Sequence, residues 1–335
     1  MDREQDNTQE DGPLSLLHRL RKKLIVAIVL GAGIFLAISV YSDFDKVAKA
    51  LVSFKLYLLP LVLGLAFLNY ILRFCKWHYY LRLLGVKISR GQSFKVFLAG
   101  LTMTISPGRF GEVVKSLFVK MIDGSPIAKT APIVAAERFT DFIGFLILSA
   151  YGAVAFATGG KVILISTAFT VAVILIVGSR RLAEPLIRLT GRVPLVRRFT
   201  DKAFEAYESI YQLIALRRLV PAVALSVVSW SCECIAFYVV LEALGLTGCA
   251  GFLNAVFIYA FSTIAGAITM MPGGIGLTEV SLTGLLVKIS CENPIPTSLA
   301  AAATIIIRLC TLWFAVVVGI IASAMLKDVG DAEKA

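Results

Sequence analysis

The stretch ISPGRFGEVVK, residues 105–115, interrupts an apolar part of the chain. Apolar residues dominate FKVFLAGLTM (94–103) before it and SLFV (116–119) after it. The stretch itself holds a proline, two glycines, an arginine and a glutamate, which either break a helix or carry charge. A helix break at bilayer depth must be buried in protein or line a wet cavity, because lipid cannot satisfy backbone hydrogen bonds. Whether this break lies in a soluble loop or inside a membrane therefore decides the fold.

Composition favours the membrane. The chain has 335 residues, of which 58% are hydrophobic and only 16% charged, whereas about a quarter of the residues in soluble domains are charged. Several apolar runs are long enough to cross a hydrocarbon layer about 30 Å thick. In such a protein, the net charge of +11 indicates the orientation of the chain in the membrane and contact with anionic lipid. We therefore expect no nucleic-acid partner.

We expect an all-α polytopic membrane protein with about six full spanning helices and two broken, re-entrant helical hairpins. The first broken segment covers 92–121 and the second covers 251–289, each interrupted by Pro and Gly. The predicted spanning helices are 24–41, 56–75, 127–157, 161–178, 219–243 and 297–325. The remaining predicted segments are a disordered cytosolic tail at 1–18, an anchor at 19–41, a basic cytosolic amphipathic segment at 179–218 and a cytosolic tail at 326–335.

The two broken segments resemble each other, which predicts an internal repeat of 56–157 and 219–325. Pro107, Gly108 and Gly111 align with Pro272, Gly273 and Gly276, all 165 residues apart. Upstream, YYLRLLG (79–85) resembles YVVLEALG (238–245), and a spanning helix with an arginine (Arg138, Arg308) follows each break. The alternative is a chance similarity between Gly-rich helix breaks.

The distribution of positive charge predicts the topology. With a cytosolic N-terminus and two re-entrant hairpins, most Lys and Arg residues face the cytosol, as does the C-terminus. Helix 56–75 then runs from outside to inside and helix 219–243 runs back, so the two repeats are inverted and one hairpin enters from each face. Only five cations fall outside, namely Lys46, Lys49, Lys55, Lys161 and Lys288.

Placing a charged residue inside the membrane costs free energy, so such residues usually form ion pairs or line a transport pathway. We expect Arg138 and Arg308 to pair with glutamates across the interface between the repeats, whereas Arg73 could snorkel to the cytosolic surface. Glu112 and Glu279 could simply cap their half-helices. The candidate binding and translocation residues are Arg73, Arg109, Glu112, Lys115, Glu137, Arg138, Asp141, Glu233, Glu279 and Arg308. The candidate break and hinge residues are Pro107, Gly108, Gly111, Pro272, Gly273, Gly274 and Gly276.

Two half-helix N-termini at mid-membrane, with Arg109 beside one of them, suit an anionic group such as a lipid phosphate. A plain hairpin that only packs the bundle is the alternative. We expect no metal and no cofactor, because six cysteines and two histidines show no metal-ligand spacing. Cys249 and Cys291 flank the second hairpin and could form a disulfide. No Walker A, Rossmann or nucleophile-elbow motif appears, so we do not expect an enzyme.

Four stretches resemble the membrane domain of lysylphosphatidylglycerol synthetases, a flippase-like family that includes stand-alone members. They are RFCKWHYYLRLLG (73–85), SPGRFGEVVKSLFV (106–119), APIVAAERFTDFIGF (131–145) and MPGGIGLTEVSL (271–282). The resemblance implies translocation of an aminoacylated or other modified lipid. The soluble domain that attaches the amino acid in two-part members has no counterpart here, so lysyl transfer is not expected.

The sequence thus predicts ATP-independent flipping or export of an anionic or modified lipid across a prokaryotic cytoplasmic membrane. Membrane lipids are the expected partners, and a second copy of the chain or enzymes of lipid synthesis are further candidates. Three alternatives stay open: a scaffold for lipid synthesis, a small-solute transporter and a membrane-embedded enzyme acting on lipid phosphates.

Overall fold

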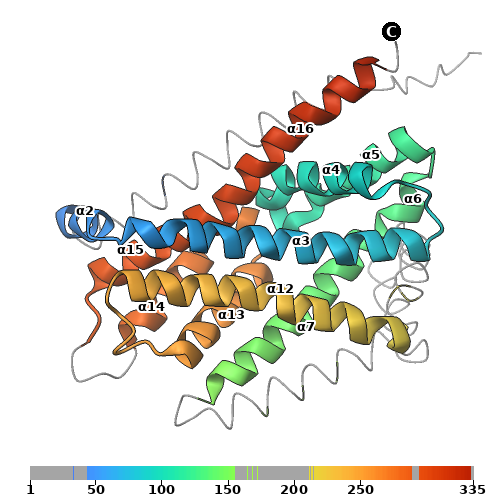
Figure 1. Ribbon diagram of the computed structural model, residues 1–335. Helices are drawn as coiled ribbons and strands as arrows, with labels where there is room; N and C mark the ends of the chain where they lie inside the picture. Colours follow the sequence, from blue (N-terminus) through green and yellow to red (C-terminus); the bar gives the residue numbers. More distant parts are fainter. Residues whose placement is uncertain are drawn as a thin grey trace, which may run out of the picture.

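The computed structural model describes residues 44–154, 215–288 and 294–332, together with a few isolated positions. These residues form helices and turns without a strand, which confirms the predicted all-α class (Figure 1). The predictions for 1–18, 19–41, 161–178 and most of 179–218 lie outside the described residues, and so does Cys291.

The helices of the first part are α2 (Phe44–Val52), η1 (Leu56–Leu58), α3 (Leu59–Leu83), α4 (Arg90–Gly100), η2 (Leu101–Ile105), η3 (Pro107–Val113), α5 (Val114–Asp123), α6 (Ile127–Thr130) and α7 (Pro132–Ala153). The later ones are α12 (Leu216–Ala243), α13 (Phe252–Ile268), η4 (Pro272–Gly274), α14 (Leu277–Lys288), α15 (Thr297–Arg308), the π-helical η5 (Leu309–Trp313) and α16 (Phe314–Ala332). The last helix extends into the stretch that was predicted as a tail.

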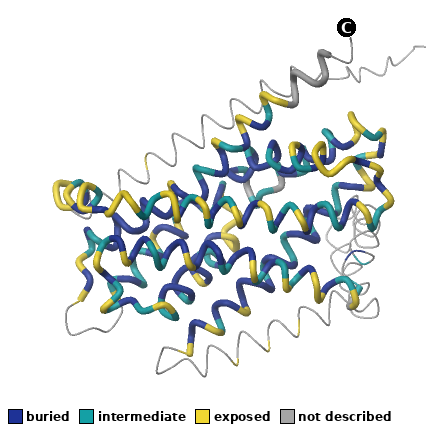
Figure 2. Tube along the Cα trace, in the orientation of Figure 1, coloured by how far each residue is buried: buried dark blue, intermediate teal, exposed yellow. Residues whose placement is uncertain are grey.

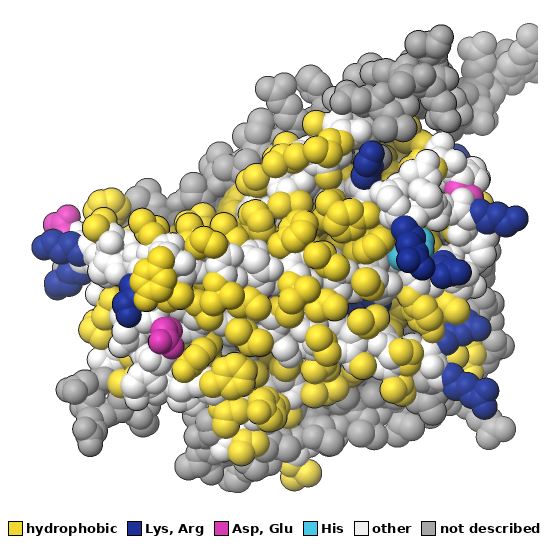
Figure 3. Space-filling view, in the orientation of Figure 1, with side chains coloured by type: hydrophobic (Ala, Val, Ile, Leu, Met, Phe, Trp, Pro, Cys, Tyr) yellow, Lys and Arg dark blue, Asp and Glu magenta, His cyan; other side chains and the backbone are white. Residues whose placement is uncertain are grey.

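Three of these helices are long and apolar enough to cross a membrane: Leu56–Leu83, Arg217–Ala243 and Thr297–Met325. Their outward faces are apolar, as in Leu68 of α3 and Val228 of α12, which are 42% and 53% exposed. Figure 3 shows this apolar surface along the middle of the molecule, with basic side chains at both ends. Such a surface is stable only in contact with lipid or other protein. The chain is therefore a helical membrane protein.

Helices α3 and α12 pack side by side and run in opposite directions (Figure 1). Near the middle of both, the Asn69 side-chain amide donates to the Ser229 carbonyl over 2.8 Å. Both helices also end in the same way, because Gly85 and Gly245 adopt φ values of 68° and 73° after the last turn. Left-handed glycine is the common helix terminator, so the LG pair that ends both aligned stretches has the same structural role in each.

Both predicted breaks are present and share one backbone geometry. Ser106 and Met271 are extended, with φ/ψ of −75°/153° and −66°/151°. After the prolines, Gly108 (57°/11°) and Gly273 (62°/12°) turn into the left-handed region. The helices on either side of each break pack against each other, α4 on α5 and α13 on α14. The aligned sequences thus fold alike through the break.

Buried positions run through the whole helical bundle, and α7, α12, α13 and α15 carry many of them (Figure 2). Small residues allow the closest approaches. A Cβ added to Gly152 of α7 would lie 2.4 Å from the backbone nitrogen of Phe257 in α13, which is far inside van der Waals contact. This tight packing joins α7 of the first unit to α13 of the second.

Candidate functional site

The two breaks touch each other at the centre of the molecule. The Gly108 nitrogen donates to the Met270 carbonyl over 3.1 Å, and a Cβ on Gly273 would lie 3.5 Å from Cγ2 of Ile105. Because Gly108 aligns with Gly273 and Ile105 with Met270, each unit offers the same pair of positions to the other. Reciprocal contacts of this kind are typical of a two-fold interface.

The glycine positions of the breaks are sterically required. Gly274 and Gly276 have φ values of 67° and 102°, which residues with a Cβ rarely adopt. A Cβ on Gly111 would lie 2.7 Å from Oγ of Ser106, whose hydroxyl accepts from the Gly111 nitrogen over 2.8 Å. The predicted break residues are therefore all placed at the turns, Pro107 and Pro272 beginning η3 and η4.

A network of buried charges surrounds the first break. Nζ of Lys115 lies 2.7 Å from Oε2 of Glu137 and 3.3 Å from Oε2 of Glu112. Nη2 of Arg138 lies 3.6 Å from Glu112 and 3.2 Å from Asp141. The structure thus brings together predicted candidates from η3, α5 and α7.

The burial of Arg73 differs from what the sequence suggested. It was predicted to snorkel toward the cytosolic surface, but it is only 2% exposed. Its Nη2 lies 3.7 Å from Oε1 of Glu112, and its guanidinium carbon lies 5.2 Å from the centre of the Trp230 ring. The snorkelling prediction is wrong because α3 turns this side chain toward α12 and the break rather than along the helix surface.

Lys76 is a buried member of the network that the sequence analysis did not name among the candidates. Its Nζ donates to Asp141 Oδ1 over 2.5 Å, to Ser226 Oγ over 2.7 Å and to Thr140 Oγ1 over 3.1 Å. The spacing offered one signal, because Arg73 and Lys76 lie three residues apart and share one face of a helix.

Trp230 is a second residue that sequence reasoning missed. Its ring centre lies 5.2 Å from the guanidinium carbon of Arg73 and 5.7 Å from that of Arg109, and the ring also packs on Phe145. Cations bind the face of an indole ring in this way. Its position midway along an apolar helix, far from the membrane boundaries that tryptophan prefers, was the available signal.

The second break holds a simpler arrangement. Nε of Arg308 donates to Glu279 Oε1 over 2.6 Å, and Nη2 donates to the Gly273 carbonyl over 2.8 Å. The other oxygen of Glu279 accepts from the Gly276 nitrogen over 2.6 Å, so the predicted capping is confirmed here. Glu112, in contrast, pairs with cations instead of capping its half-helix.

The expectation that the arginines pair across the interface between the repeats is wrong. Arg308 pairs with Glu279 and Arg138 pairs with Glu112, each within its own unit. In both cases the arginine of the following helix reaches the glutamate just after the break. The pairing is therefore itself a repeated feature.

The charged cluster around the first break, to which α12 of the second unit adds Glu233, carries more positive than negative charge. Glu233, the remaining candidate, accepts from the Tyr259 hydroxyl over 2.5 Å and lies on α12 beside the network. Arg109 makes no ion pair with any residue in the described ranges, and Nε and Nη2 of both Arg73 and Arg138 lack a hydrogen-bond partner there. The cations are Arg73, Lys76 and Lys115, which are buried, and Arg109 and Arg138, which are half-buried; the acids are Glu112, Glu137, Asp141 and Glu233, all buried. Five cations face four acids, so one further anion would balance the site.

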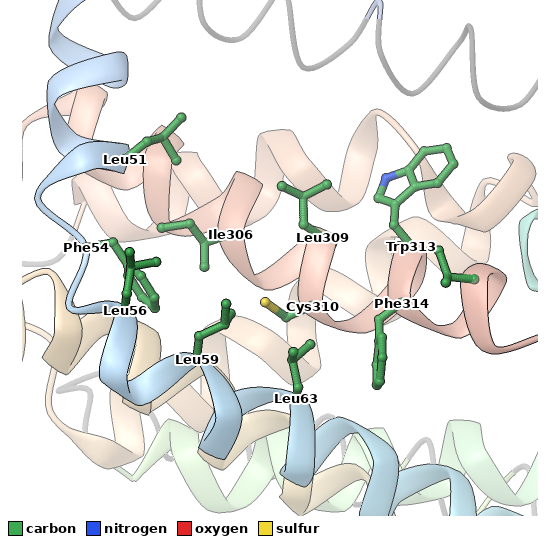
Figure 4. Close-up of a pocket in the computed structure, with 11 residues that line it drawn as sticks. Leu51, Phe54, Leu56, Leu59, Leu63, Ile306, Leu309, Cys310, Trp313 and Phe314 are labelled. Atoms are coloured by element: carbon green, nitrogen blue, oxygen red, sulfur yellow. The ribbon is translucent and has the colours of Figure 1, made fainter.

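An apolar cavity of about 490 Å³ lies to one side, between the start of α3 and the α15–α16 region (Figure 4). Leu59 and Leu63 line one wall, and Ile306, Cys310 and Phe314 line the other. None of the charged candidates lines it. The polar chemistry of the described residues is therefore concentrated at the breaks, and no described group of three or more His, Cys, Asp or Glu residues is placed to hold a metal.

Comparison with known proteins agrees with this geometry. Residues 24–319 match the model of a family described as the lysylphosphatidylglycerol synthase TM region. The chain belongs to this family. The match includes both breaks and every charged candidate, so the predicted resemblance is confirmed.

Several archaeal relatives are described as UPF0104 membrane proteins. The one from Pyrococcus horikoshii is 23% identical over 327 residues, covering 89% of this chain and 95% of the relative. The one from Methanocaldococcus jannaschii is 22% identical over 336 residues, covering 93% and 97%. A third, from Methanothermobacter thermautotrophicus, is 31% identical over 100 residues, which is 30% of this chain and 28% of the relative.

Proposed function

We propose that this protein of the lysylphosphatidylglycerol synthase TM-region family moves an anionic or modified lipid across a prokaryotic cytoplasmic membrane without ATP. The observation that carries the proposal is the meeting of the two helix breaks beside a buried cluster with one excess positive charge. The proposal assigns translocation to this chain and not aminoacyl transfer. The acids at the breaks support this assignment because most of them are engaged by cations or by a hydroxyl group.

In the proposed arrangement the two units form an inverted-topology repeat, and α4–α5 and α13–α14 are re-entrant hairpins that enter from opposite faces. The antiparallel α3 and α12, the matching break dihedrals and the reciprocal contact between the breaks support it. Transporters of several folds place their substrate where such discontinuous helices meet at the midplane. Both termini lie in the cytosol in this topology.

The lipid phosphate would occupy the place of the missing anion. Arg109 presents a guanidinium that, among the described residues, is engaged by the face of Trp230 without an ion pair, and Arg73 and Arg138 keep unsatisfied donors there. A phosphate that accepted from these groups would satisfy buried donors, each of which costs about 1–3 kcal/mol when left unpaired.

The test is lipid movement in proteoliposomes that contain headgroup-labelled phospholipids of different charge. We expect the native chain to move an anionic or modified lipid. Arg109→Ala and Arg138→Ala should each reduce the rate at least tenfold, because each removes a cation from the cluster. Lys129→Ala is the matched control, since it removes an exposed cation of α6 and should leave the rate unchanged.

Unchanged movement in both arginine variants would contradict the proposal. No movement by folded native protein across a broad lipid panel would also contradict it and would favour a scaffold. Solute uptake or current without lipid movement would favour a solute transporter, and consumption of a lipid phosphate would favour an enzyme.

A further inference from the structure

A second basic site lies at the C-terminal end of α3, and none of its lining residues belongs to the buried cluster. A cavity of about 520 Å³ opens where α3 ends and α4 begins, within the range of about 300–1,000 Å³ that ligand sites occupy. Figure 3 shows the basic side chains and a histidine gathered at this end of the molecule. The lining residues are His78, Arg82, Val86, Lys87, Ile88, Ser89 and Arg90.

The walls of this cavity are fixed by local structure. Val86 and Ile88 are buried and anchor the connection between the helices. Ser89 caps α4, its Oγ accepting from the Gln92 nitrogen over 3.2 Å. His78 Nδ1 lies 3.1 Å from Oγ of Ser93. The cavity therefore exists before any ligand arrives, which lowers the entropic cost of binding.

The positive charge of the cavity favours an anionic ligand. Arg82, Lys87 and Arg90 are exposed and make no ion pair with any residue that the structure describes. The carboxylate of the nearby Asp123 bonds to the backbone instead of to these side chains, because its Oδ1 accepts a hydrogen bond from the backbone nitrogen of Lys87 over 3.2 Å. The positive end of α4 adds to the field of the three cations.

The depth of the cavity matches the phosphate level of a bilayer. The helical stretch Leu56–Leu83 has 28 residues, or about 42 Å at 1.5 Å per residue. That length exceeds the hydrocarbon core of about 30 Å and equals the thickness that includes the headgroups. The end of α3 therefore lies among the headgroups when the helix spans the membrane.

An exposed stripe of α3 leads to the cavity. Leu68, Ile71 and Cys75 are exposed and are followed by His78 and Arg82 in the cavity wall. Their spacings of three and four residues place all five on one helix face. A ligand that fits both features needs a hydrocarbon chain for this face and an anionic group for the cavity at its end. Phospholipids combine the two.

We propose that this cavity binds the phosphate of an anionic phospholipid, whose acyl chain lies along the Leu68–Cys75 stripe of α3. Arg82, Lys87 and Arg90 hold the headgroup. The site is distinct from the buried cluster, and binding here does not require that the chain translocates lipid.

Native mass spectrometry of the full chain, titrated with phosphatidylglycerol or phosphatidylcholine of equal chain length, tests the proposal. Arg82→Gln/Lys87→Gln/Arg90→Gln removes the three cations of the cavity. Lys49→Gln/Lys55→Gln/Lys288→Gln is the matched control, because it removes three exposed cations elsewhere. We expect the first variant to weaken phosphatidylglycerol binding on the order of fivefold per removed charge, with phosphatidylcholine binding unchanged.

A third variant, Arg82→Lys/Arg90→Lys, keeps the charge and should keep most of the binding. An equal loss in the control variant would overturn the proposal, since bulk charge would then explain the affinity. Retained binding in the triple glutamine variant would overturn it as well. Competition by millimolar inorganic phosphate as effective as that by phosphatidylglycerol would overturn the lipid assignment in favour of a soluble anion.

Discussion

Arg109 has a backbone conformation that its side chain does not favour. Its φ is 57°, and the aligned position in the second unit is Gly274, with a φ of 67°. A non-glycine residue in this region is strained by about 1–3 kcal/mol and persists where the surrounding structure enforces it. The first unit therefore keeps an arginine at a turn where glycine is the less strained choice.

Arg109→Gly and Arg109→Ala separate the backbone effect from the charge effect. Both variants lose the guanidinium, but only Gly relieves the left-handed strain. We expect Arg109→Gly to be more stable than Arg109→Ala by about 1 kcal/mol, seen as a higher apparent melting temperature in detergent, while both lose transport. Equal melting temperatures would contradict the strain argument. Gly274→Ala should be destabilised, because its new Cβ would lie 2.8 Å from Oγ1 of Thr278.

The sequence could identify charged residues but not their partners. Arg109, Glu112, Glu137 and Asp141 stand out because charge is rare in apolar segments. Lys76 did not, because its neighbours Trp77 and Tyr79 also fit a membrane boundary. Only the packing of α3 against α7 and α12, which sequence spacing does not reveal, buries this ammonium group beside Asp141.

At the scale of elements, the Pro-Gly motifs predicted both helix breaks because proline and left-handed glycine act locally. Other elements depend on wider context. The amphipathic α2 (Phe44–Val52) was not predicted, and the segment 127–157 was predicted as one helix although Pro132 starts a new one. The π-helical η5 after Arg308 was also not predicted. Its extra residue is accommodated by tertiary contacts, such as the hydrogen bond from Tyr70 to the Thr311 carbonyl.

Packing between α7 and α13 gives a prediction at this scale. Gly152→Ala should push the two helices apart, because its Cβ would meet the Phe257 backbone at 2.4 Å. Overpacking of this kind costs about 1–3 kcal/mol. Gly64→Ala is the control, since nothing lies within 4 Å of its Cβ and alanine favours the helix. Thermal unfolding in detergent should show a lower midpoint for Gly152→Ala only, and a midpoint equal to that of Gly64→Ala would contradict the packing argument.

At the scale of the whole molecule, the antiparallel α3 and α12 constrain the topology. The end of α3 and the start of α12 belong to one hydrophobic cluster, which includes Leu81 and Leu219. The start of α3 and the end of α12 share a different cluster, in which Val240 is buried and against which Leu59 packs. If both helices span the membrane, Lys87 and Arg217 share one side and Lys55 and Gly248 share the other.

Single-cysteine accessibility tests this arrangement. In a background without native cysteines, we expect Lys55→Cys and Gly248→Cys to react with a membrane-impermeant maleimide in intact cells. Lys87→Cys and Arg217→Cys should react only after the membrane is opened, since the positive charge predicts that they face the cytosol. All four positions are exposed, so burial would not mask the result. If only one of Lys55→Cys and Gly248→Cys reacted in intact cells, the antiparallel pair would not span the membrane as one unit. The inverted repeat with its shared central site would then be wrong.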